Sequence, residues 1–527
     1  MLLTLLALLA VQDPEAILKE ARSAQASFER TRRFHLPRSH AEARHRCDEQ
    51  IGGLCYWYDP GESPPPPEGA AIAAARSALL VELAAAAERL PGNPWILGQQ
   101  VWYLIEASRL DEARDLAGRC AAARGWCSAL AGLVLHRAGA IPSADSAFSR
   151  ALGLVEPEAR CGWLDIRLLL SGSAARQWRS LSCAEQVVAA EGWLERGRPL
   201  LALAGNSVRT EFLSRQAIVR IVEGTLTPYG TRLDDAHREF VLRYGWSTGW
   251  SQGQAWAGGR DGSVRGHDPF PAWGLTPANL TGDEFDINHD RPRARFPVPG
   301  LAALLTLEDV QLARFPRPGG TLLVAAWQLP PANPLNTAGV TGVLAGKTLR
   351  QAPEVAGQIP DGRGGVASAV ATGALVSGGL ELLTADGATW ARHREEWADP
   401  LPTSGPVLSD LLLYQAGESN PELLDEVLPR AIRGTAVRRG GAIGLYWEWA
   451  RLPPGTEAVS TRIQLRPGRG GAATLAWSWP AQNPMPRSGS GSMGLDLGRL
   501  GRGEYILEVV LTVGARELRS QRALRVN

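Results

Sequence analysis

The chain has 527 residues with 55 Lys or Arg and 54 Asp or Glu, so its formal net charge is +1. A chain of this length predicts several domains, each able to bury its own core. The near-zero net charge excludes an overall electrostatic attraction to nucleic acid or to an anionic membrane surface.

Residues 1–12 form a signal-like segment that begins with the apolar run MLLTLLALLA. The run is too short to span a bilayer, which needs about 20 residues, but it fits the apolar region of a signal peptide with Ala10 as the cleavage point. We therefore expect an exported protein, periplasmic or extracellular. The alternative is a buried N-terminal segment, because no positive residue precedes the run. No later segment is apolar enough for a transmembrane helix, so we expect none in the mature chain.

The cysteines fall into three close pairs, Cys47/Cys55, Cys120/Cys127 and Cys161/Cys183. An even, locally paired set in an exported chain predicts disulfides rather than catalytic thiols. The first pair lies in residues 13–68, where we expect a helix, a disulfide loop and a proline-rich linker. The alternative is free thiols buried between helices. Zinc is disfavoured, because the sequence has no CxxC or HxxxH spacing.

Residues 69–205 are rich in Ala and Leu with helical periodicity. Within them, Gly132 is followed by Ala144, Phe148 and Ala151 at distances of 12, 16 and 19 residues. This spacing resembles the tetratricopeptide repeat, in which small residues let two antiparallel helices cross closely and an aromatic side chain fills the groove. The resemblance implies a helical solenoid that offers a concave surface to a protein partner.

Residues 206–300 read as two more helices followed by a stretch rich in Trp and Gly. Trp246, Trp250, Trp256 and Trp273 lie in this stretch, and we expect them to pack as a plug. Residues 301–400 and 405–527 contain short apolar stretches, such as TLLVAAWQL, that are separated by Gly, Pro, Asn and Asp. The predicted fold class is multi-domain, α then β: an N-terminal tetratricopeptide-like solenoid followed by two antiparallel β-sandwich-like modules.

The order of these parts resembles exported bacterial proteins that carry the GWxTD domain. Three passages carry the resemblance: RYGWSTGW at 243–250, VLSDLLLYQAGE at 407–418, and IGLYWEWARLPPG with the later LDLGRLGRGEYILEVVLTV. The name motif is not intact, because Gly249-Trp250 is followed by Ser-Gln-Gly rather than x-Thr-Asp. The resemblance implies an exported, non-catalytic protein with helical repeats ahead of β-modules.

The densest polar cluster is GDEFDINHD at residues 282–290. Asp286, Asn288 and Asp290 match the opening of a calcium loop, where alternate oxygens face the ion. Arg and Pro stand where such a loop needs Gly and Glu, so the sequence favours a solvated turn over a metal site. We expect no bound cofactor.

His267 and His289 are each followed by an aspartate. A histidine beside a carboxylate suits a general base or a metal ligand, and a hydrolase or metalloenzyme centred on this pair is one hypothesis. No matching nucleophile was identified for them. Histidines that bond backbone carbonyls where a loop packs on a sheet are therefore the favoured interpretation.

Trp447 and Trp449 alternate along one predicted strand, and Trp477 and Trp479 alternate along another. Residues two apart on a strand point to the same face. Each pair therefore forms either a core layer or an exposed ligand platform that stacks on sugar rings. The run GSGSMG at 489–494 matches a dinucleotide fingerprint by letters, but it precedes a predicted strand rather than a helix, which indicates a hairpin loop.

These observations favour an exported, non-catalytic protein-interaction or structural protein of the bacterial envelope. Its protein partner would bind the helical-repeat surface, and nucleic acid is not expected to bind. A carbohydrate-binding protein that uses the Trp platforms is the first alternative, and the His267/His289 enzyme is the second.

Overall fold

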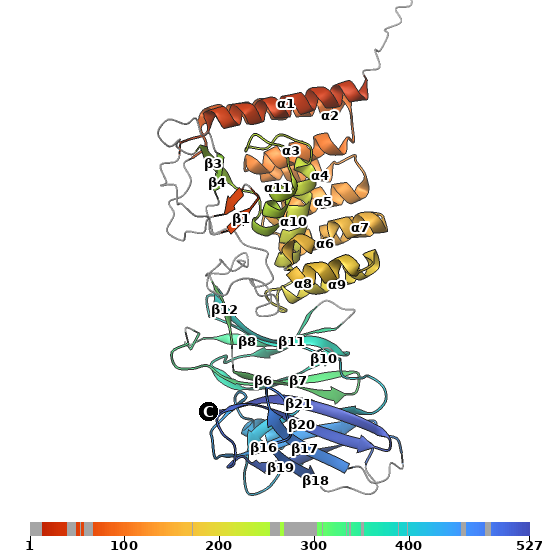
Figure 1. Ribbon diagram of the computed structural model, residues 1–527, viewed down its shortest axis with the longest axis vertical. Helices are drawn as coiled ribbons and strands as arrows, with labels where there is room; N and C mark the ends of the chain where they lie inside the picture. Colours follow the sequence, from red (N-terminus) through yellow and green to blue (C-terminus); the bar gives the residue numbers. More distant parts are fainter. Residues whose placement is uncertain are drawn as a thin grey trace, which may run out of the picture. The chain divides into compact units, whose positions relative to one another are not determined.

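The computed structural model describes most of the chain, which divides into two compact units. The described residues are 13–38, 49–52, 54–56, 67–170, 172–252, 264–267, 303–307, 309–333, 335–336, 339–348, 353–387, 389–397, 399–454, 460–479 and 486–527. One unit comprises Met1–Pro199 with Ala204–Pro299, and the other comprises Leu200–Leu203 with Gly300–Asn527. We call them the helical unit and the β unit (Figure 1). The predicted order of helices followed by antiparallel sheets is confirmed.

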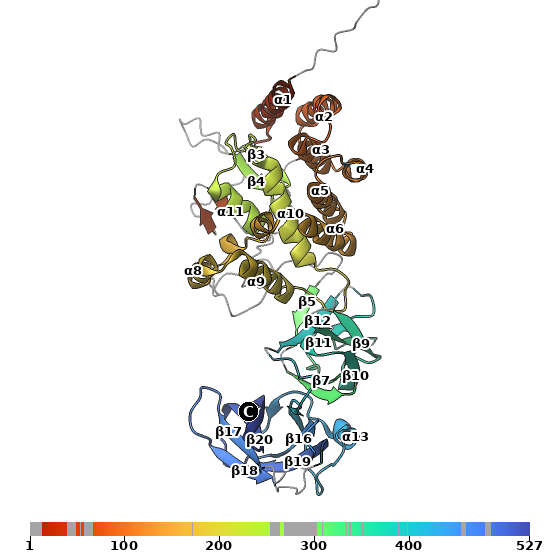
Figure 2. The ribbon, with the colours of Figure 1, turned by 90° about the vertical axis from the view of Figure 1, so that its right-hand side faces the viewer.

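Consecutive helices of the helical unit pack side by side from α1 to α6 (Figure 2). The helices are α1 (Pro14–His35), α2 (Ala70–Arg89), α3 (Pro94–Glu106), α4 (Leu110–Gly118), α5 (Arg124–Arg137), α6 (Ile141–Leu154), α7 (Pro157–Trp163), η1 (Arg167–Leu169), α8 (Gly172–Ser180), α9 (Cys183–Arg196), α10 (Ser207–Val222) and α11 (Asp235–Tyr244). Two short hairpins accompany them, β1 (Glu49–Ile51) with β2 (Leu54–Tyr56) and β3 (Gly249–Gln252) with β4 (Val264–His267).

Capping residues fix where two of these helices begin. The Asn93 side chain accepts hydrogen bonds from the first N–H groups of α3, and Pro94 stands in the first turn, where no N–H donor is needed. Ser182 and Glu185 form a reciprocal capping box at the start of α9. Both starts are encoded locally in the sequence.

Gly132 on α5 and Phe148 on α6 face each other where the two helices cross. A Cβ atom at position 132 would lie 2.9 Å from the Phe148 ring, closer than carbon atoms pack. The small residue therefore lets the aromatic side chain lie flat against the neighbouring helix. The spacing of these two residues in the sequence thus corresponds to a direct contact in the structure.

Helix α10 lies against α3, α5, α6 and α9. All of its side chains except those of Glu211 and Arg220 are buried. Gln99 of α3 donates a hydrogen bond to the Ile221 carbonyl over 2.6 Å, and His136 of α5 bonds Glu211 over 2.6 Å. The chain therefore covers the surface of α3 and α5 with its own helix.

Helix α2 is the one helix among the described residues that is long and apolar enough to cross a membrane by length and composition. The sequence alone predicted no such segment after residue 12. In the structure, Ile72, Leu79 and Leu83 of α2 belong to the core of the helical unit, where α2 packs between α1 and α3. Packing within the unit accounts for this apolar face of the helix.

The β unit contains two modules, each built from two sheets. The first has β5 (Ala303–Thr306), β6 (Val310–Arg317), β7 (Gly320–Gln328), β8 (Thr341–Thr348), β9 (Glu354–Ile359), β10 (Gly364–Thr372), β11 (Leu375–Leu383) and β12 (Thr389–Glu396), in the orders β10-β7-β6 and β5-β12-β11-β8-β9. The second has β13 (Val407–Leu408), β14 (Leu412–Gln415), α13 (Leu424–Val427), η2 (Leu428–Arg430), β15 (Ala436–Val437), β16 (Ala442–Ala450), β17 (Ser460–Pro467), β18 (Leu475–Trp479), β19 (Gly489–Asp496), β20 (Gly503–Val513) and β21 (Arg516–Val526). Its sheets have the orders β13-β16-β14, with β19 also on β16, and β15-β21-β20-β17-β18. Pairing is antiparallel except for β5 with β12 and β15 with β21.

Strands β6 and β7 of the β10-β7-β6 sheet are buried on both faces, whereas β10 is partly exposed. One face, with Leu312, Leu323 and Trp327, packs against the five-stranded sheet of its own module. The opposite face, with Phe315 and Val324, packs against the second module, whose contributing residues are Leu412, Tyr414, Leu424, Val427 and Tyr446. This double burial explains why TLLVAAWQL is apolar without a polar alternate position.

Leu200–Leu203 belongs to the β unit although the helices before and after it in the chain do not. Glu381 on β11 accepts hydrogen bonds from the backbone N–H groups of Leu201 over 2.6 Å and Ala202 over 2.8 Å. Burial raises the pKa of Glu381 above its usual range, although the two N–H donors act in the opposite direction.

The core of the second module contains large aromatic residues placed opposite glycines. Trp447 and Trp449 on β16 pair directly with Gly491 and Gly489 on β19. A Cβ atom at position 491 would lie 2.3 Å from the Trp447 ring, and one at 489 would lie 2.6 Å from the Trp449 ring. The glycines of GSGSMG therefore make room for indole rings, and this run is a β-strand rather than the expected loop.

Gly491→Ala is expected to destabilise the β unit, because the new methyl group displaces the Trp447 ring. An overpacked core typically loses about 1–3 kcal/mol. Gly494→Ala on the same strand is the matched control, since its nearest atom would be Asn420 Oδ1 at 3.9 Å. Thermal unfolding followed by circular dichroism measures both, and equal melting temperatures for the two variants would contradict this account.

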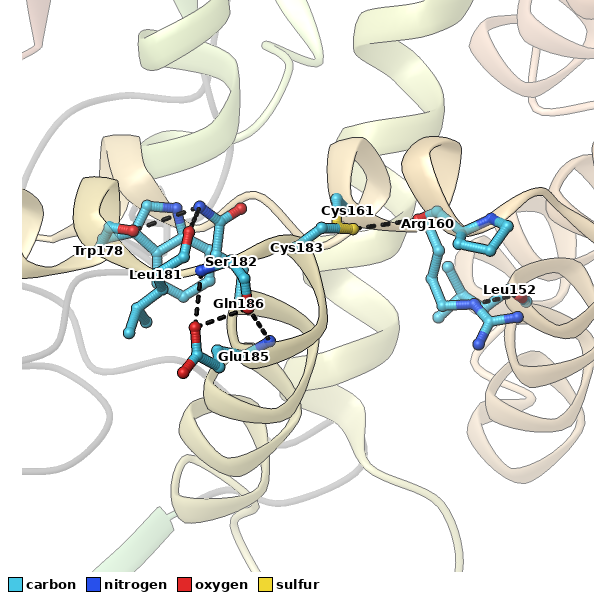
Figure 3. Close-up of a disulfide and its surroundings, with 10 residues drawn as sticks. Leu152, Arg160, Cys161, Trp178, Leu181, Ser182, Cys183, Glu185 and Gln186 are labelled. Atoms are coloured by element: carbon cyan, nitrogen blue, oxygen red, sulfur yellow. Dashed lines mark hydrogen bonds between the residues drawn. A yellow bond between two sulfur atoms is a disulfide. The ribbon is translucent and has the colours of Figure 1, made fainter.

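Two disulfides join cysteines that the sequence paired. Cys120–Cys127 links the end of α4 to α5, and Cys161–Cys183 links α7 to the first residue of α9 (Figure 3). Each bond closes a short loop, of 7 and 22 residues in sequence separation. The third predicted pair, Cys47/Cys55, is not settled, because Cys47 and the Cys55 side chain lie outside the described residues.

Replacing both Cys161 and Cys183 by Ser is expected to destabilise the helical unit by about 3 kcal/mol, and replacing Cys120 and Cys127 by about 2 kcal/mol. The larger loss belongs to the larger loop, because its closure removes more entropy from the unfolded chain. Urea unfolding of the full chain, followed by far-ultraviolet circular dichroism, gives the comparison. A larger loss for the 120/127 pair would exclude loop entropy as the main cause.

Candidate functional site

Most residues of the predicted polar site lie outside the described part of the chain. Asp286, Asn288, Asp290 and His289 are outside the described residues. His267 is on β4, opposite Gly249 of β3, and its side chain is likewise not described. In the described parts of the chain, no group of three or more His, Cys, Asp or Glu side chains is arranged to hold a metal ion.

The proposed Trp platforms are largely core. Trp447 is 0 % exposed and Trp449 is 2 % exposed. Trp477 and Trp479 are half-buried. The Trp479 ring lies edge-on to the rings of Trp447 and Trp449, at centroid distances of 5.8 and 5.9 Å. Trp447 and Trp449 therefore cannot stack on a sugar, because their faces are already covered by the sandwich.

The RYGWSTGW segment packs on the helical unit. Gly245 ends α11 with a φ of 88°, which favours glycine, and the chain then turns into β3. Trp246 lies edge-on to Trp102 of α3, with ring centroids 5.7 Å apart, and Trp250 lies 6.1 Å from Trp246. Both indoles belong to the helical core. Trp256 and Trp273 lie outside the described residues, so the full plug stays a prediction.

Ser247, His237 and Asp234 lie close together at this segment. Their grouping was not predicted from the sequence. Asp234 bonds the Nδ1 atom of His237 over 2.7 Å, and the buried Nε2 atom of His237 has no hydrogen-bond partner. His237 and Ser247, the centre of the letters Gly-Trp-Ser-Thr-Gly, line the same cavity of about 10 Å³. That volume suits one water molecule and no substrate. The cavity that His237 and Ser247 share is therefore too small to hold a substrate.

The two modules of the β unit meet in a joint that combines an apolar core with buried ion pairs. Arg314 of β6 donates to both carboxylate oxygens of Asp410, over 2.9 and 3.1 Å. The amide of Gln311 bonds the backbone of Leu413 as both donor and acceptor. Arg522 of β21 donates across the joint to the Leu312 carbonyl of β6. Since these groups are desolvated and paired, the joint holds the modules in one register.

A groove of about 920 Å³ opens beside this joint. We call it the Arg317 groove, and its walls come from both modules. The lining residues are 316–317 at the end of β6, 318–319 of the following turn, 320–321 of β7, 401–403 of the linker, 422–425, Tyr446 and 448–450 of β16 with Arg451 after it, and 488–490 at the start of β19. A cleft of this size is large enough for several residues of an extended peptide.

The floor of the Arg317 groove is a fixed charge pair. Arg317 donates to both oxygens of Glu448, over 2.5 and 3.2 Å, and the Tyr446 hydroxyl donates to Glu448 over 3.0 Å. Burial, with Glu448 adding to its effect, raises the pKa of Tyr446 well above its usual range, so the hydroxyl remains a donor at physiological pH. A partner therefore meets polar groups that are already oriented.

The rim of the groove is apolar and open. Leu423 is 63 % exposed, and Pro316, Pro318 and Pro402 lie along the same groove. Arg451 adopts a left-handed backbone conformation, with a φ of 58°, and its Nε atom donates to the Gly405 carbonyl, which pins the linker wall. The groove thus combines an exposed apolar side chain with rigid walls.

One signal in the sequence points to this groove. Glu448 stands between two buried tryptophans in a strand that is otherwise apolar, and Arg317 stands between two prolines. Burying a charged side chain in such a strand costs free energy unless an opposite charge pairs with it. Both positions are therefore expected to have an ion-pair partner. Their pairing with each other, across 131 residues, could not be read from the sequence.

Comparison with known proteins leaves the family open. No protein-family model matches the chain, and no curated protein matches it. Among solved structures, it is similar to the FN1–FN3 domains of chicken CNTN1, with 13 % identity over 43 % of this chain and 69 % of that one and a TM-score of 0.16. It is also similar to a putative β-galactosidase from Bacteroides fragilis, with 10 % identity over 40 % of this chain and 33 % of that one and a TM-score of 0.17. Values this low carry no functional argument.

Proposed function

We propose that the chain is an exported, non-catalytic interaction protein of the bacterial envelope, and that the Arg317 groove binds an extended segment of a partner protein. The observation that carries the proposal is an open groove with Leu423 exposed on its rim and the Arg317–Glu448 pair on its floor. Exposed apolar groups beside oriented polar groups are typical of peptide-binding clefts.

The tetratricopeptide-like and GWxTD-like resemblances remain part of this proposal. Their implication of helical repeats ahead of β-modules agrees with the order of the two units. The partner surface differs from the one the repeats suggest, because α10 already covers α3 and α5. A partner that binds the β unit does not have to displace α10.

The proposed export is supported by the two disulfides, since such bonds persist in oxidising compartments. Cell fractionation of a bacterial host that expresses the full chain, followed by intact mass, tests it. We expect the protein in the envelope or medium, shortened near Ala10, and heavier after reduction by two hydrogen atoms for each disulfide. A cytosolic, uncleaved chain would contradict the export proposal.

Leu423→Asp is expected to reduce partner recovery roughly ten-fold, because a charge on the rim opposes burial against an apolar side chain. Affinity capture from an envelope fraction with purified wild-type and variant proteins measures the recovery. Val370→Asp is the matched control, since Val370 is a 56 % exposed apolar residue on β10 that does not line the groove. Equal loss in both variants, or no partner with the wild type, would contradict the proposal.

A further inference from the structure

Side chains from three helices bury a cluster of charges at one end of the helical unit. It consists of Glu29 and Arg32 on α1, Arg76 on α2, and Tyr103 and Glu106 on α3, and we call it the α1 charge cluster. Glu29, Arg32 and Tyr103 are each 3 % exposed or less. Charged groups are rarely buried this deeply unless each has a partner, so their pairing decides how well α1 binds to the helices beneath it.

Arg32 is the centre of the cluster. Its Nη1 atom donates to Glu106 over 3.3 Å, its Nη2 atom bonds the second oxygen of Glu106, and its Nε atom lies 3.6 Å from Glu29. The guanidinium also lies 4.5 Å from the Phe28 ring and 5.0 Å from the Trp250 ring. The two carboxylates and the aromatic faces together hold the cation in place of water.

Glu29 is the less well satisfied of the two carboxylates. Its Oε1 atom accepts a hydrogen bond from the Tyr103 hydroxyl over 2.7 Å, while its buried Oε2 atom has no hydrogen-bond partner. Arg76 lies nearer to Glu106, with 3.8 Å between Nε and Oε2, and also pairs with Glu68 ahead of α2. Glu29 therefore competes for cations that other carboxylates already hold.

The sharing of cations shows which state of Glu29 the cluster favours. Among the described residues, Arg32 is the cation that pairs with Glu29, and both of its Nη atoms already bond Glu106. Arg76 divides between Glu106 and Glu68, which lies outside the cluster and is partly exposed. An ionised Glu29 therefore shares the charge of Arg32 with Glu106 and keeps one oxygen without a hydrogen bond, a state that burial disfavours, whereas a protonated Glu29 needs no further cation.

We propose that the α1 charge cluster is a proton-dependent latch: α1 is held tightly on α2 and α3 while Glu29 is protonated, and its hold weakens as Glu29 ionises. The groups that face Glu29 are Arg32 from α1, Arg76 from α2, and Tyr103 and Glu106 from α3. Gln25, which donates to the Tyr103 hydroxyl and to the Leu226 carbonyl, is neutral. This inference does not depend on the Arg317 groove.

The pH range follows from the two states of α1. Burial raises the pKa of Glu29 from its usual 4.5 to about 7, with Arg32 opposing the shift and Glu106 adding to it. Burial also raises the pKa of Tyr103 well above 10, so Tyr103 stays protonated throughout. Because the carboxyl pKa is raised in the bound state, protonated Glu29 contributes fully to α1 binding below pH 4.5. This contribution is lost as the pH rises to about 7. The difference of about 2.5 pH units corresponds to roughly 300-fold at most.

Hydrogen exchange of the full chain between pH 5 and pH 8, corrected for the intrinsic pH dependence of exchange, tests the latch. We expect the protection factors of α1 to fall with rising pH in the wild type, by up to roughly 70-fold between pH 5 and pH 8. Glu29→Gln, which is neutral at every pH, should remove most of this dependence. Glu20→Gln is the control, because Glu20 lies on the same helix with its side chain 64 % exposed and should leave the wild-type fall intact.

A second variant keeps the test decisive if Glu29→Gln does not fold. Tyr103→Phe removes the hydrogen bond that favours the ionised Glu29, so the midpoint of the α1 transition should move to higher pH. An unchanged or lower midpoint would overturn the proposal. So would wild-type protection factors of α1 that do not vary between pH 5 and pH 8.

Discussion

The β unit depends on two strands, β6 and β7, that are buried on both faces. Because β6 and β7 are covered on both sides, neither module can be completed without the other: the first module's sheet supplies Phe315 and Val324 to a core that the second module closes. Polar groups at the border of this core are partly removed from water, and pairing offsets the cost of their desolvation. The Arg314–Asp410 and Arg317–Glu448 pairs provide this and at the same time fix the register of the modules.

The Arg317 groove is a consequence of this arrangement. Arg317, the last residue of β6, reaches past the border of the shared core to Glu448 on β16, and the space between the β6–β7 turn and the second module remains open. Its walls are strands and pinned loops rather than free segments. A partner that binds there would therefore lose little affinity to ordering the receptor.

Both units solve a packing problem in the same way. In the helical unit, Gly132 lets Phe148 lie against α5, and in the β unit, Gly491 and Gly489 leave room for Trp447 and Trp449. A large ring opposite a missing Cβ fills space that two medium-sized side chains would fill less precisely. Hence the glycine-rich run that resembles a dinucleotide fingerprint has a structural reason in the tryptophans of the neighbouring strand.

The sequence alone predicted the order of helices and strands, the approximate start of the β part and two cysteine pairs that the structure joins. Periodicity, capping and short separations are local properties, so they can be read from neighbouring residues. It left open whether Trp447 and Trp449 were core or platform, and it did not connect Glu29 with Glu106 or Arg317 with Glu448. Those outcomes depend on which segments, distant in the sequence, are in contact in the fold. These tertiary contacts determine both burial and charge pairing. Only the tertiary structure could therefore decide which aromatic rings are covered, which carboxylates are desolvated and where a groove remains open.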